Sequence, residues 1–193
     1  MLLVDINVLV DVLQNDPQWA EWSIAQMRAQ AKLHVLVINP VIYAEMSLSF
    51  SREFEAPAAL VFRAHTEQSL FVQWMGPRGT TCQVDRFHAA TGGAFRYTIG
   101  AGTATFTFFG SYHEVLAPQR IVHTWEFQGD PGHPTLETLT FIDLADGRCR
   151  LDGLSVYTSS TQCDEMLAFD QTGEGMDENF ERLDELIEDR VHL

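Results

Sequence analysis

The feature that most constrains the fold of this chain is a series of short strand-type segments that occupies its middle. Six such segments lie between residues 80 and 157, and the loops between them are short and rich in Gly, Pro and Asp. Strands joined by loops this short pair as antiparallel hairpins, and Asp146-Gly147 is the clearest turn. The preceding segment, residues 48–57, alternates polar and apolar residues and is closed by Pro57, which is typical of an edge strand.

Helical patterns lie on both sides of these strands. Residues 58–74 have a helical pattern, and residues 175–193 form an amphipathic helix whose acidic residues indicate a solvated face rather than a docking surface. An antiparallel sheet must bury one face, and the last helix is the only predicted element long enough to cover it. The sequence therefore predicts an α+β fold in which an antiparallel sheet wraps on a long C-terminal helix. The apolar stripe of that helix comprises Met176, Phe180, Leu183, Ile187 and Val191.

Several phrases of residues 48–193 resemble those of one family. The phrases "SREFEAPAALVFRAHTEQSLFVQWMGPRG", "GSYHEVLAPQRIVHTWEF" and "TLTFIDLADGRCRL" occur in this order. They are similar to the activator-of-heat-shock-ATPase (Aha-type) homologues of the START/SRPBCC superfamily. The resemblance implies a complete helix-grip domain that binds a small hydrophobic ligand or a client protein, as a possible co-regulator of a chaperone ATPase. Gly153 interrupts the last predicted strand, which indicates a bulge or a close approach to the backbone.

The first 47 residues have a different organisation. A short apolar run is followed by helical patterns, a buried-type strand "HVLVI" and a helix start at Asn39-Pro40. The phrases "LLVDINVLVDVL" and "INPVIYAEM" resemble the opening of PIN-domain ribonucleases, the toxins of VapC-type toxin–antitoxin pairs. The resemblance implies that residues 1–47 are a truncated α/β PIN-like segment, fused to the second domain, in which Asp5 and Glu45 are remnants of a metal site.

Two carboxylates are too few for the chemistry of that family. Magnesium needs several oxygen ligands, and the acids that later strands of PIN domains supply have no counterpart after Ser47. Without the resemblance, Asp5 would be a turn or capping residue and Glu45 part of a solvated helix face. We therefore expect no cofactor, magnesium being needed only if the segment were active, and a magnesium-dependent ribonuclease is an incomplete alternative. A second alternative is protein interaction, including a homodimer, through the exposed apolar strand edge.

One face of the predicted sheet is rich in aromatic residues. Alternation along the strands gathers them on one side, with a few polar tips among them. Such walls are typical of a small-ligand pocket, and simple core packing is the alternative explanation. His123 could act as a base, although an inward histidine between Ile121 and Trp125 is more often a core residue with satisfied hydrogen bonds. The candidate cavity residues are Phe95, Tyr97, Phe106, Phe108, Tyr112, His123, Trp125, Phe127, Tyr157, Met176 and Phe180.

Charge and cysteine content narrow the function classes. A formal net charge of −15 repels phosphate backbones, which argues against a nucleic-acid partner. The three cysteines have no paired spacing and no apolar run reaches membrane-spanning length, so we expect a cytoplasmic protein without a membrane partner. Zinc, phosphate-loop and nucleophile motifs are missing from the sequence, so no catalytic residue is assigned. The sequence therefore predicts a non-enzymatic binding module.

Overall fold

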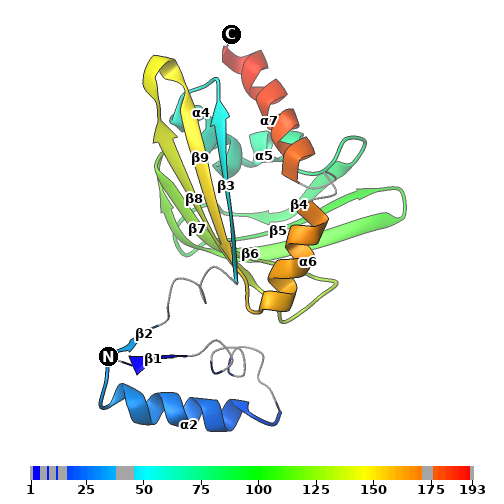
Figure 1. The fold of residues 1–193 in the computed structure, drawn as a ribbon. Coiled ribbons are helices and arrows are strands. Elements are labelled where there is room, and N and C mark those ends of the chain that lie inside the picture. The colour runs from blue at the N-terminus through cyan, green and yellow to red at the C-terminus, as the bar shows by residue number, and fades with distance from the viewer. Residues whose placement is uncertain are drawn as a thin grey trace.

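A seven-stranded antiparallel sheet forms the main body of the chain (Figure 1). The computed structural model describes residues 2–4, 8, 12, 17–37, 46–170 and 176–191. The strand order is β3-β9-β8-β7-β6-β5-β4, so β3 is an edge strand, as the sequence predicts. The strands are β3 (Ser47–Phe54), β4 (Thr81–Phe87), β5 (Ala94–Ala101), β6 (Ala104–Leu116), β7 (Arg120–Phe127), β8 (Thr135–Asp143) and β9 (Cys149–Val156).

The hairpin between β8 and β9 turns where the sequence predicts. Asp146 and Gly147, in a short 3-10 turn (Ala145–Gly147), have φ values of 63° and 77°. Both residues thus lie in the left-handed region, which Gly and Asp adopt more readily than other residues and which matches the twist of the flanking strands.

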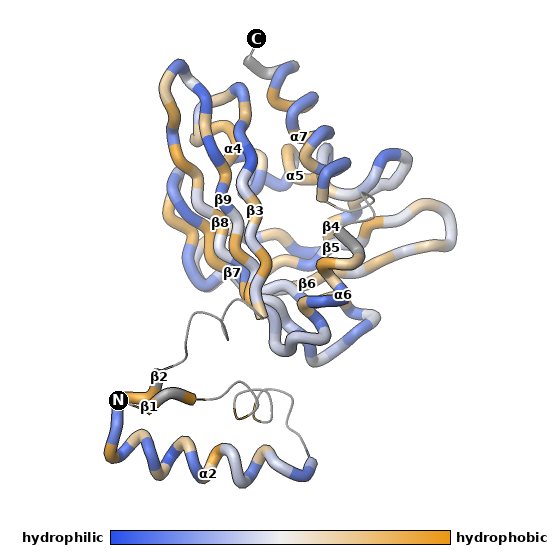
Figure 2. The backbone as a smooth tube through the Cα atoms, in the orientation of Figure 1, coloured by the Kyte–Doolittle hydropathy of each residue, from blue (hydrophilic) through white to orange (hydrophobic). Residues whose placement is uncertain are grey.

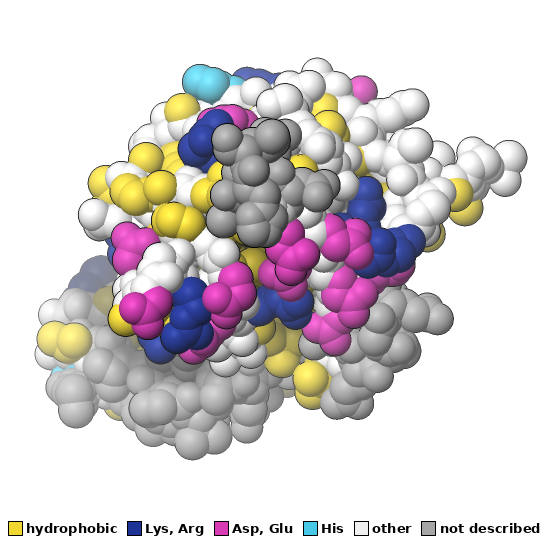
Figure 3. All heavy atoms as spheres, turned by 90° about the horizontal axis from the view of Figure 1, so that it is seen from above, with side chains coloured by type: hydrophobic (Ala, Val, Ile, Leu, Met, Phe, Trp, Pro, Cys, Tyr) yellow, Lys and Arg dark blue, Asp and Glu magenta, His cyan; other side chains and the backbone are white. Residues whose placement is uncertain are grey.

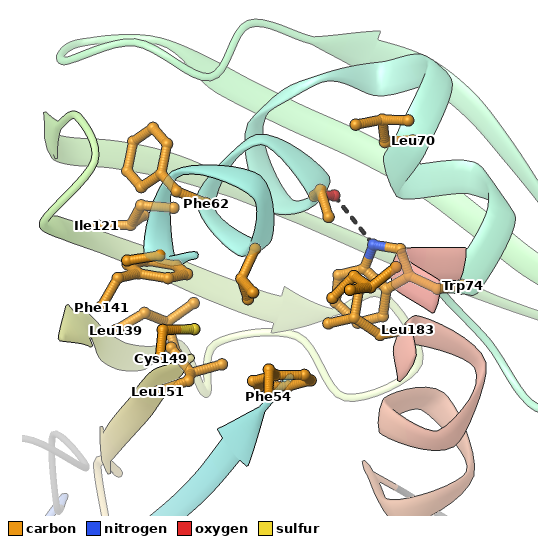
Figure 4. Packing of buried hydrophobic residues seen from close by; sticks show 14 of the residues in the cluster. Phe54, Phe62, Leu70, Trp74, Ile121, Leu139, Phe141, Cys149, Leu151 and Leu183 are labelled. Atoms are coloured by element: carbon orange, nitrogen blue, oxygen red, sulfur yellow. Dashed lines mark hydrogen bonds between the residues drawn. The ribbon is translucent and has the colours of Figure 1, made fainter. Parts of the chain in front are cut away.

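The predicted helix over residues 58–74 is two helices. The first, α4 (Ala58–Thr66), is separated from α5 (Gln68–Trp74) by Glu67, whose backbone is extended (φ −98°, ψ 117°). The indole Nε1 of Trp74 donates a hydrogen bond of 2.9 Å to the carbonyl of Ala64, which ties the two helices together across the break (Figure 4). The hydrophobic period continues through the break, so periodicity alone could not reveal it.

The C-terminal part contains two helices where the sequence predicts one. Helix α7 (Met176–Val191) has the predicted apolar stripe, visible as alternating apolar and polar stretches in Figure 2. Helix α6 (Ser160–Asp170) was not predicted, because its apolar residues do not form a single stripe. The prediction that the last helix alone covers the sheet is wrong. Helices α4, α5 and α7 lie together on one face, which we call the inner face (Figure 1).

The hydrophobic core lies between these helices and the sheet. Leu183 of α7 and Val61 of α4 are fully buried, and they belong to the same cluster as Ile121 and Leu151 of the sheet (Figure 4). Burying side chains of this size contributes about 1.5–3 kcal/mol each to folding. Sequence segments more than 100 residues apart are therefore joined by one core.

The acidic side chains of α7 are compensated by arginines. Arg78 lies within 2.6–3.7 Å of the carboxylates of Glu178, Glu181 and Glu185, and Arg52 pairs with Asp184 at 2.5 Å. Figure 3 shows acidic and basic side chains interspersed on this part of the surface. The pairs agree with the prediction of a solvated face rather than an acidic docking surface.

Gly153 is a point of close approach and not a bulge. It pairs in unbroken register with Phe50 of β3 and with Leu139 of β8. A Cβ atom at Gly153 would lie 2.0 Å from Cε1 of the Phe50 ring. The ring therefore covers the glycine, and only a residue without a side chain fits beneath it.

The N-terminal elements form a separate small unit. Strands β1 (Leu2–Leu3) and β2 (Leu36–Val37) pair in parallel, and α2 (Ala20–Ala31) lies between them in sequence. The ring centroids of Trp19 and Trp22 lie 6.2 Å apart in an edge-to-face contact. The described residues contain a strand, a helix and a strand in this order, and the predicted helix start at Asn39-Pro40 lies outside them. Asp5 and Glu45 lie outside the described residues.

Candidate ligand-binding site

A continuous row of aromatic rings crosses the inner face of β5, β6 and β7. The ring centroid of Phe127 lies 5.9 Å from that of Phe106 and 5.5 Å from that of Phe108. Tyr97 lies 5.6 Å from Phe108 and 5.8 Å from Phe95. Phe106 is 51% exposed and Phe95 only 6%, so the row runs from solvent into the core. We call these five residues the aromatic row.

The buried end of the aromatic row meets a line of polar side chains. The Phe95 ring lies 5.7 Å from the His123 ring, and Nε2 of His123 lies 3.2 Å from Oε2 of Glu137. The other carboxylate oxygen, Oε1, accepts a hydrogen bond of 3.1 Å from the hydroxyl of Ser155. His123, Glu137 and Ser155 are register partners on β7, β8 and β9, so the sheet itself places them side by side. We call them the polar ladder.

Glu137 carries the charge of the polar ladder. Burial by itself raises its pKa, but the hydrogen bonds from His123 and Ser155 outweigh burial and hold the pKa below the ordinary value. Glu137 is therefore ionised at neutral pH, and its Oε2 accepts the Nε2–H of His123. The other ring nitrogen of His123, Nδ1, is buried without a hydrogen-bond partner among the described residues.

Other titratable groups near the polar ladder stay neutral. Burial lowers the pKa of His65 to about 4, and its Nδ1 lies 2.8 Å from the carbonyl of Val61, to which it donates in the neutral ring. Burial raises the pKa values of Tyr97 and Tyr112 above the ordinary phenol value, so both keep their hydroxyl protons.

Six further predicted residues lie at different places around this site. Tyr112 is buried at 5.7 Å from His123, and Trp125 lies 6.2 Å from Phe108, so both flank the aromatic row. Phe180 instead contacts Phe50 and Phe54, whose centroids lie 5.3 and 6.2 Å away, and belongs to the packing of α7. The three that remain are placed as follows: His123 in the polar ladder, Tyr157 buried just past β9, and Met176, 38% exposed, at the start of α7.

Sequence reasoning missed Glu137 and Ser155. A signal was present for Glu137, because alternation along β8 places it on the inner face with Thr135, Leu139 and Phe141. A lone carboxylate at such a position is costly unless it is paired, so it marks either a structural network or a functional site.

A hollow of about 480 Å³ lies on the opposite face of the sheet. Its lining includes Arg96, Phe109, Thr124 and Glu126, which alternate along their strands with the inward-facing residues. It is therefore a site distinct from the predicted one.

Within residues 46–170 and the other described segments, no group of three or more His, Cys, Asp or Glu side chains is arranged to hold a metal ion. No helix in the same part of the chain combines the length and the apolar character needed to cross a bilayer.

These features define the class of the protein: an antiparallel sheet that grips helices on an aromatic inner face is the helix-grip fold of the START/SRPBCC superfamily. The chain belongs to the family described as "Activator of Hsp90 ATPase homolog 1-like protein", which matches residues 55–188. The match does not extend to residues 1–47, whose resemblance to PIN domains remains a prediction.

Solved structures share the fold. A crystal structure from Rhodobacter sphaeroides is 24% identical with a TM-score of 0.67, covering 74% of this chain and 93% of its own. A solution structure from Staphylococcus epidermidis is 26% identical with a TM-score of 0.62, covering 75% of this chain and 90% of its own. No curated protein matches the chain.

Proposed function

We propose that the chain is a non-enzymatic binding module that takes a small, mainly apolar molecule on its inner face. The observation that carries the proposal is the aromatic row, which runs from exposed Phe106 to buried Phe95 and ends at His123. Aromatic walls bind an apolar body, and a few fixed polar groups at one end set its orientation. The polar ladder supplies such groups, because the contact between the Glu137 carboxylate and Nε2 fixes the orientation of the His123 ring.

The proposal is tested with a neutral apolar fluorophore, N-phenyl-1-naphthylamine, titrated into the full chain. Phe108 and Phe109 are neighbours in β6 and both half-buried, but Phe108 faces inward and Phe109 outward. We expect one-to-one binding that Phe108→Ala weakens about tenfold through lost apolar contact, while Phe109→Ala leaves it unchanged. Equal effects of the two substitutions, or no saturable binding by the wild type, would contradict the proposal.

A second candidate follows from the family. Its description names an activator of the Hsp90 ATPase, so a protein client or a chaperone is an alternative partner. Addition of the full chain to Hsp90 in a steady-state ATPase assay separates the two candidates. Stimulation that Phe108→Ala leaves intact would favour the chaperone partner over the small ligand.

A further inference from the structure

The hollow on the face of the sheet opposite the helices, which we call the outer face and the outer hollow, contains two arginines that face each other. Arg86 of β4 and Arg96 of β5 are register partners, and both line the hollow of about 480 Å³. Like charges directly opposite in an antiparallel pair are destabilising. The chain has only 12 Lys and Arg residues against 27 Asp and Glu, yet two of these few cations form one cross-strand pair.

A bulge creates this pairing. The register of β4 against β5 shifts between Val84 and Arg86, which leaves Asp85 as the extra residue and turns Arg86 to the outer face opposite Arg96. Bulges are common where a strand must re-aim a side chain, often beside functional sites. An unbulged β4 would have placed Asp85, and not Arg86, opposite Arg96.

The two guanidinium groups differ in how they are held. The Arg96 group lies 5.9 Å above the Phe109 ring, 3.4 Å from the Asp85 carboxylate, and donates to the Gln128 side chain. The Arg86 group has no ion pair or hydrogen bond to any described residue. Arg96 is therefore fixed in place, whereas the donors of Arg86 remain available.

We propose that this hollow binds a small organic oxyanion, a carboxylate or a phosphate monoester on an aromatic body. Arginine is suited to such groups because its planar donors bind two oxygens at once. The Phe109 ring offers an apolar wall for the body, and the hydroxyl of Thr124 lies in the same lining. Glu126 also lines the hollow, but its Oε1 accepts a hydrogen bond of 2.6 Å from the backbone N–H of Gly132. The site lies on the other face from the ligand proposed above and is independent of it.

The test uses benzoate, phenyl phosphate and, as the uncharged control, benzamide, each titrated into the full chain while backbone amide resonances are followed by NMR. We expect saturable shifts at Arg86, Arg96 and Thr124 with the two anions only. The anion that binds with the higher affinity indicates whether the site prefers a carboxylate or a phosphate monoester.

Variants of the full chain decide the role of the arginine pair. Arg86→Gln should weaken binding about tenfold while leaving the melting temperature equal or higher, because it also removes the like-charge pair. Arg120→Gln, which removes the same charge from an arginine paired with Glu114 outside the hollow, is the matched control and should bind as the wild type does. The proposal would be overturned if benzamide bound as tightly as benzoate, if the shifts lay elsewhere in the protein, or if binding was not saturable. An unaltered affinity of Arg86→Gln for the anions would also overturn it.

Discussion

Replacing His123 by Phe should destabilise the protein by leaving Glu137 as a buried charge without its main partner. The Phe ring keeps the contacts with Phe95 and Tyr112 but cannot donate to Oε2 of Glu137. Breaking a fully buried ion pair costs about 3–5 kcal/mol. Here the two side chains are still 12% and 15% exposed, and Ser155 still donates to Oε1. We therefore expect a loss of about 2–3 kcal/mol in the free energy of unfolding.

The same structure predicts that removing both His123 and the charge of Glu137 destabilises the protein less than removing His123 alone. In His123→Phe/Glu137→Gln the buried charge is gone, and the amide oxygen of Gln can still accept the Ser155 hydroxyl. We expect the double variant to be about 1–2 kcal/mol more stable than His123→Phe at pH 7. Urea unfolding measures both, and His133→Phe, at an exposed histidine beside Asp130, should stay within about 0.5 kcal/mol of the wild type.

The pH dependence of this difference has a defined sign. In the wild type the pKa of Glu137 is lowered, so its contribution to stability is present above the unfolded-state pKa and is lost as the pH falls through the folded-state pKa. In His123→Phe the imidazole no longer donates to Glu137, so the effect of burial dominates and raises the pKa of Glu137 above its unfolded-state value. The single variant should then gain stability relative to the double variant as the pH falls from about 7 to 5. This account of the polar ladder would be refuted if His123→Phe were as stable as the wild type, or if the double variant were no more stable than the single one.

Three further predictions concern the fold and the N-terminal segment. Gly153→Ala should cost about 1–3 kcal/mol in urea unfolding, because the new Cβ drives the Phe50 ring against Phe180; unchanged stability would mean that the ring moves away freely. The carbonyl of Met46 accepts a hydrogen bond from the backbone N–H of Tyr157, directly after β9. A chain that begins at Met46 should therefore unfold in one cooperative step, and a molten state would place the domain boundary elsewhere. The full chain should not cleave RNA with magnesium or manganese, and cleavage that disappears in Asp5→Asn would contradict this.

Much of the sheet could be predicted from the sequence because its signals are local. Alternation with a period of two assigns Tyr97, Phe108 and Trp125 to one face, and the turn residues Asp146 and Gly147 end one strand and begin the next. The resemblance of residues 48–193 also pointed to the family that the comparison found over residues 55–188. These features depend on neighbouring residues, which a sequence displays directly.

The polar ladder and the outer hollow were decided only by the tertiary structure. His123, Glu137 and Ser155 come together because β7, β8 and β9 are neighbours in a particular register, and Arg86 faces Arg96 because of one inserted residue. The break at Glu67 likewise depends on packing that Trp74 makes with an earlier helix. Register and packing are fixed by contacts between distant segments, and a shift of one residue moves every side chain of a strand to the other face. The sequence alone therefore determined which residues each strand contributes to a face, and the fold determined which of them meet.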